Sequence, residues 1–75
     1  MNVRSIPDLR ELRVDGLLSM LVPVIKALEK HGRATPENAW IQFEQFKRSQ
    51  QHLYCAAEFI ELENRMIEQF PWIDE

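Results

Sequence analysis

The amino-acid sequence predicts a small all-α protein, and three observations support this fold class. The 75-residue chain is 45% hydrophobic and 28% charged, which is typical of a folded globular domain. It contains only two glycines and four prolines, so it has few residues suited to the turns of a β-sheet. Apolar residues recur at steps of three and four among strong helix formers. We therefore expect one helical domain over residues 1–75.

The N-terminal segment, residues 1–15, is expected to contain a short helix. Ser5-Ile6-Pro7-Asp8 has the pattern of a capping box at a helix N-terminus. If this helix continued, Arg10 and Arg13 would fall on the apolar face of the next segment. We therefore expect a break at Asp15-Gly16, with the aspartate capping a new helix.

A second helix is expected over residues 16–32. Its apolar stripe consists of residues at alternating steps of four and three: Leu17, Leu21, Val24 and Leu28. Pro23 lies on the polar side of this helix, where a bend can curve the apolar face around a core. Gly32 follows the basic last turn and can adopt the left-handed conformation that ends a helix.

The second half of the chain is expected to form one long helix over residues 35–69, followed by a tail at 70–75. Thr35 and Pro36 suit an N-cap and a first helical position, and neither Gly nor Pro recurs before Pro71. This helix would overhang its partner, so we expect a helical hairpin that dimerises into a bundle. The alternative is a closed monomeric three-helix bundle with a break near residues 47–52.

Two surfaces of the long helix are candidates for protein contacts. The expected dimer seam follows a heptad-like line with polar inserts: Phe43, Phe46, Gln50, Leu53, Ala57 and Ile60. The expected partner-binding surface combines aromatic, methionine and acidic residues of the helix end and tail: Phe59, Glu63, Met66, Phe70, Trp72, Glu58 and Glu61.

The charge distribution argues against general nucleic-acid binding. Net charge is −3, and residues 36–75 contain three basic against eight acidic residues. A local basic patch remains the alternative nucleic-acid site: Lys26, Lys30, Lys47 and Arg48. These cations lie near aromatic residues in the sequence, but the heptad spacing places those aromatics in the core.

The sequence predicts no catalytic, cofactor-binding or metal site. His52 and Cys55 are three residues apart on one helical face, but structural zinc needs four ligands and no second cysteine exists. A single cysteine suits a reducing compartment, so we expect a cytoplasmic location. The longest apolar stretch, residues 17–25, is too short to span a membrane.

These observations favour a non-enzymatic intracellular regulator or inhibitor that binds a larger protein through its helix surface and C-terminal tail. A helical nucleic-acid-binding protein and a small metal-binding or enzymatic helical protein are the alternatives.

Overall fold

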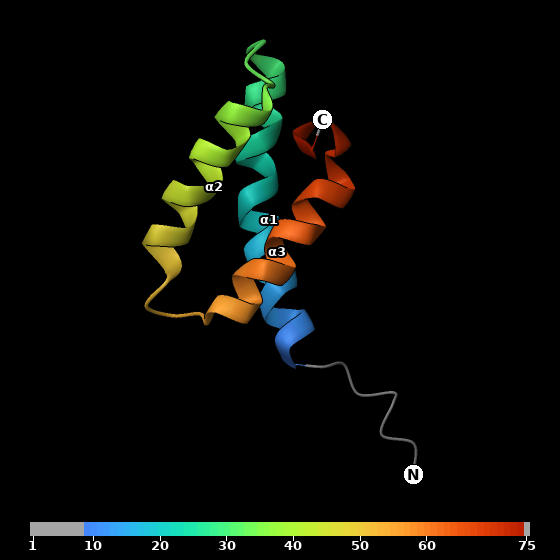
Figure 1. The fold of residues 1–75 in the computed structure, drawn as a ribbon. Coiled ribbons are helices and arrows are strands. Elements are labelled where there is room, and N and C mark those ends of the chain that lie inside the picture. Colours follow the sequence, from blue (N-terminus) through green and yellow to red (C-terminus); the bar gives the residue numbers. More distant parts are fainter. Residues whose placement is uncertain (1–8, 75) are drawn as a thin grey trace.

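The computed structural model describes residues 9–74, and every regular element in this range is helical (Figure 1). α1 spans Leu9–Lys30, α2 spans Pro36–Gln50 and α3 spans Ala56–Gln69. A short 3-10 helix, η2, follows at Pro71–Asp74. The prediction of an all-α protein is confirmed for this range. The capping box expected at residues 5–8 lies outside it.

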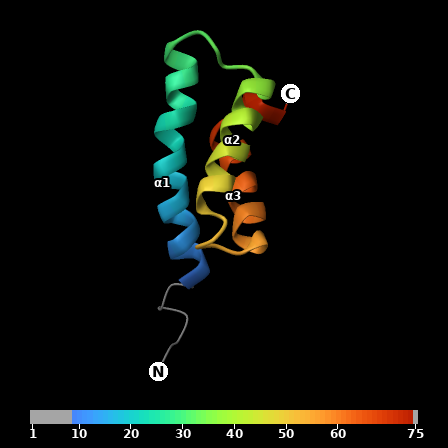
Figure 2. The ribbon, with the colours of Figure 1, turned by 90° about the vertical axis from the view of Figure 1, so that its left-hand side faces the viewer.

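One hydrophobic core joins all four elements. α2 and α3 both lie on one side of α1, the longest helix (Figure 2). In Figure 1, α3 crosses in front of α1, and η2 packs against both α2 and α3. The buried apolar residues are Val14, Leu17, Leu21, Ile25, Ala39, Phe43, Phe59, Leu62, Met66, Phe70 and Ile73. The core therefore depends on the return of the C-terminal segment as well as on the three α-helices.

α1 continues past Gly16 without interruption, so the break expected there is wrong. That expectation rested on the arginines that a continuous helix brings next to its apolar face. Arg13 is accommodated because it pairs with Glu58 of α3. Asp15 accepts a hydrogen bond from α3 instead of capping a new helix. The expectation of two helices over residues 1–32 assumed that an arginine next to the apolar face would have no partner. The contact of Arg13 with α3 supplies that partner.

The turn between α1 and α2 has the predicted local chemistry. Gly32 has a φ of 69°, in the left-handed region that glycine adopts without steric cost. Thr35 is the N-cap of α2, and its Oγ1 accepts a hydrogen bond from the Asn38 N–H at 3.2 Å. Pro36 is the first residue of the helix. These cap predictions are confirmed.

The single helix expected over residues 35–69 is divided in the structure. α2 ends at Gln50 and α3 begins at Ala56, with a turn between them. The interruption begins at Gln51, inside the polar run at 47–52 where the alternative prediction placed a break. Both shorter helices pack against α1. The long helix on which the predicted hairpin rested is therefore replaced by two shorter helices in the described range.

The C-terminal segment folds back onto the helices. Phe70 and Ile73 are only 5% and 1% exposed. The Trp72 indole Nε1–H donates a hydrogen bond to Glu29 Oε2 at 2.9 Å, near the end of α1. The rings of Phe70 and Trp72 pack edge to face, with centroids 6.3 Å apart. The segment completes the core in this way.

Candidate protein-binding surface

The partner-binding surface expected from the sequence is largely part of the core. Its three apolar helix-end residues, Phe59, Met66 and Phe70, are buried. Glu58 is also buried, while Glu61, Glu63 and Trp72 are half-buried. The expected surface is therefore corrected, because α1 and the returning tail cover these side chains.

The expected dimer seam is divided between the core and the surface. Phe43 is buried, and Phe46 and Gln50 are half-buried. Leu53, Ala57 and Ile60 are exposed. A continuous seam required one straight helix, and the turn at residues 51–55 interrupts its helical phase.

The four cations of the expected nucleic-acid patch lie toward two different ends of α2. Lys26 and Lys30 are close to the C-terminus of α1, where the chain turns into α2. Lys47 and Arg48 occupy the last turn of α2, roughly 18 Å further along at 1.5 Å per residue. That end lies near Arg13, whose guanidinium contacts the following turn. The structure therefore does not bring these four residues together.

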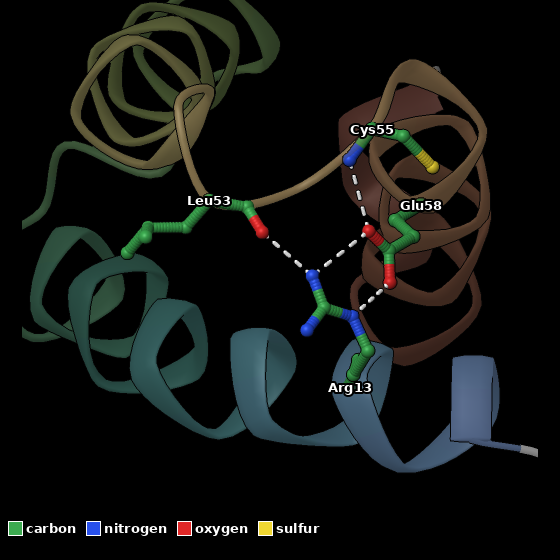
Figure 3. A network of polar contacts seen from close by, with 4 residues as sticks. All are labelled: Arg13, Leu53, Cys55 and Glu58. Atoms are coloured by element: carbon green, nitrogen blue, oxygen red, sulfur yellow. Dashed lines mark hydrogen bonds and ion pairs between the residues drawn. The ribbon is translucent and has the colours of Figure 1, made fainter.

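Arg13 is the centre of a polar network that joins α1 to the turn before α3 (Figure 3). Its Nε donates to Glu58 Oε2 at 2.5 Å, and its Nη2 donates to the Leu53 carbonyl at 2.6 Å. The guanidinium also lies over the Tyr54 ring, 4.4 Å from the centroid. Glu58 Oε1 accepts from the Cys55 N–H at 2.9 Å, at the N-cap of α3.

This network holds Glu58 ionised. The hydrogen bond from Arg13, followed by the one from the Cys55 backbone, lowers the pKa of Glu58 to about 2. At neutral pH, Glu58 is therefore a carboxylate already engaged by donors on two sides. Such a group stabilises the turn and the start of α3, and its proton is not available for acid–base chemistry near neutral pH.

A different surface, on α1, exposes apolar side chains. Leu9, Leu12 and Met20 are 74%, 53% and 46% exposed. Together with exposed smaller residues they recur at steps of three and four, which places them on one helical face. We call this face the outer face of α1: Leu9, Leu12, Gly16, Met20, Pro23 and Ala27. It points away from the stripe that packs into the core.

An open groove borders the C-terminal half of the outer face. It lies between α1 and α2 and has a volume of about 780 Å³. Its lining residues are Pro23, Val24, Ala27, Leu28, His31, Arg33 and Gln42. The α1 side of this groove is mainly apolar, and no carboxylate is among the lining residues. The groove and the outer face form the candidate protein-binding surface.

The sequence contained a signal for the outer face that the predicted break concealed. Leu9, Leu12 and Met20 are in phase only when α1 is continuous through Gly16. If the chain formed two separate helices here, Leu9 and Leu12 would belong to one helix and Met20 to the other. Pro23 was also assigned to a polar side, although Ala27 extends the apolar line beyond it.

No three His, Cys, Asp or Glu side chains within residues 9–74 are grouped so as to hold a metal ion. In the same range, no helix combines the length and the apolar character needed to cross a bilayer. His52 and Cys55 are exposed near the α2–α3 turn. No protein-family model matches the chain, and neither curated proteins nor solved structures gave a match.

Proposed function

We propose that this protein is a non-enzymatic regulator or inhibitor that acts by binding a larger protein through the outer face of α1 and the adjoining groove. The observation that carries the proposal is the exposure of Leu9, Leu12 and Met20 along one face of a helix whose opposite face packs into the core. Large exposed apolar side chains aligned on one face of a small domain are typical of protein-interaction surfaces.

The shape of this surface favours a protein partner over a nucleic acid. The outer face follows α1, which is about 33 Å long at 1.5 Å per residue. An extended apolar strip buries area against another folded chain, whereas nucleic-acid binding needs clustered cations along the contact. The separation of Lys30 from Arg48 therefore counts against the nucleic-acid alternative.

The oligomeric state and the location stay predictions. A homodimer could still use the exposed remainder of the expected seam, Leu53, Ala57 and Ile60. Sedimentation equilibrium at micromolar concentration would contradict this if the mass stays near the 8.9 kDa of one chain. The exposed free Cys55 suits the reducing cytoplasm that we propose as the location.

Site-specific photo-crosslinking in cells tests the proposal directly. A photoreactive amino acid at Met20 or Gln42 should give a discrete crosslinked protein, because these positions lie on the outer face and in the groove. The same probe at Asn64, which is exposed on α3, is the control. The Ala27→Glu variant should abolish the crosslink. Equal products from all three positions, or none, would contradict a partner at this surface.

A further inference from the structure

The charges of α1 are divided between two sides of the helix. Asp15 Oδ1 accepts a hydrogen bond from Arg65 at 2.7 Å, and Glu29 accepts one from Trp72. Glu11 is close enough to Arg65 to contribute to raising its pKa. All three carboxylates of α1 are therefore directed toward α3 and η2.

The groove side of α1 carries the opposite charge. Arg33 lines the groove, and Lys30 is exposed on α1 about one turn after the lining residue Ala27. Within residues 9–74, neither ion pair of the structure engages Lys30 or Arg33. An apolar floor is thus bordered by cations in a chain whose net charge is −3. This local excess of positive charge is a recognition feature for an acidic partner.

We propose that the groove and the outer face bind an acidic amphipathic helix of a partner protein; this deepens the proposed function and rests on it. The apolar side of that helix would lie on Val24, Ala27 and Leu28. Its flanking carboxylates would lie within reach of Lys30 and Arg33. A helix suits the site because the walls are themselves helices and offer no sheet edge, and helix-in-groove binding relies on apolar anchors at helical spacing.

Charge also distinguishes this occupant from a second copy of the chain. Two copies that met groove to groove would bring Lys30 and Arg33 of both chains into one interface, with no carboxylate among the lining residues to neutralise them. Like charges across an interface oppose association. An acidic helix instead neutralises them, and weaker binding at high salt is the expected signature.

A titration with two matched peptides can test this inference on the full chain. Both are designed amphipathic helices of about 18 residues, long enough to follow most of α1. They share leucines at helical spacing, and their remaining positions are glutamate in one peptide and lysine in the other. Amide chemical shifts of the ¹⁵N-labelled protein report where each peptide binds.

The glutamate peptide should shift the amides of Val24, Ala27 and Gln42, with little change at Asn64 on α3. The lysine peptide should bind at least about tenfold more weakly, because Lys30 and Arg33 repel it. The double variant Lys30→Glu, Arg33→Glu should weaken binding of the glutamate peptide by roughly tenfold, because it reverses two exposed charges. Ala27→Glu should also weaken binding of the glutamate peptide. Asn64→Glu, which adds the same charge on α3, is the control and should leave binding unchanged.

Three results would overturn the inference: equal binding of the two peptides, shifts centred on Asn64, or no shifts with either peptide. Concentration-dependent shifts of the groove without peptide would identify a second copy as the occupant and would overturn it as well. If crosslinks from Met20 persist although the glutamate peptide does not bind, the proposed protein-binding function stands and the inference of an acidic helix as partner is wrong. If the crosslinks are also absent, the proposed function fails too.

Discussion

Arg13 and Glu58 are 45 residues apart in the sequence, yet their side chains form an ion pair between α1 and the first turn of α3. The same guanidinium donates to the Leu53 carbonyl, and the same carboxylate accepts from the Cys55 N–H. The two side chains therefore connect α1 to the middle and the C-terminal end of the turn between α2 and α3. A long-range contact thus stabilises the start of α3.

Acid should destabilise the protein through Glu58. The pKa of this carboxyl falls from 4.5 to about 2 because Arg13 and the Cys55 N–H bind its ionised form. Since the folded pKa lies below the unfolded one, the stabilisation is fully present above pH 4.5 and is lost as the pH falls toward 2. We expect the urea midpoint of unfolding to decrease across this window.

The Glu58→Gln variant isolates this contribution. It should be less stable than the parent at pH 7, and its urea midpoint should depend less on pH between 4.5 and 2. Glu68→Gln, on the exposed side of α3, should keep the pH profile of the parent. A Glu58→Gln profile that parallels the parent's would show that the ion pair does not stabilise the fold.

The helical fold class and the turn at residues 31–35 could be predicted because both depend on local chemistry. The left-handed glycine and the Thr35 cap act within a few residues of themselves. The turn at residues 51–55 contains no helix breaker, and its local signal is limited to Glu58, whose side chain accepts from the Cys55 N–H at the start of α3. It is stabilised by Arg13 from another helix, and tertiary contacts of this kind override helix propensity.

Two glycine substitutions should have opposite effects on stability. Gly16 lies inside α1, and an added Cβ would meet nothing within 4 Å. Gly16→Ala should therefore stabilise the fold by about 0.5–1 kcal/mol. Gly32→Ala should destabilise it by about 1 kcal/mol, because its φ of 69° is unfavourable for alanine. Urea unfolding measures both, and a loss of stability in Gly16→Ala would argue against a continuous α1.

The candidate surface was harder to predict than the fold. An aromatic cluster such as Phe59 and Phe70 looks the same in sequence whether it binds a partner or its own tail. Only the return of η2 shows that these residues are buried. The outer face of α1 depends on the phase between Leu12 and Met20, and that phase depends on the accommodation of Arg13 by α3.

Two isoleucine-to-alanine changes should separate the core role of the tail from its expected binding role. Ile73 is 1% exposed and Ile60 is 62% exposed, so the same change removes a buried group in one case only. Ile73→Ala should cost about 2–4 kcal/mol of unfolding free energy. Ile60→Ala should change it by about 0.5 kcal/mol or less. Equal effects in urea unfolding would show that the tail does not pack as described.

The hydrogen bond from Trp72 to Glu29 should control the environment of the tail indole. Trp40→Phe leaves Trp72 as the only tryptophan, so the tryptophan fluorescence reports on the environment of this side chain alone. In that background, Glu29→Ala should shift the emission to longer wavelength, because the indole loses its partner and gains water. Helix content by circular dichroism should stay unchanged, since Glu29 is exposed and Ile73 still anchors the segment. Glu44→Ala, an exposed carboxylate of α2, should leave the emission where it is. If Glu29→Ala also leaves the emission wavelength unchanged, the burial of Phe70 and Ile73 holds the tail in place without this hydrogen bond.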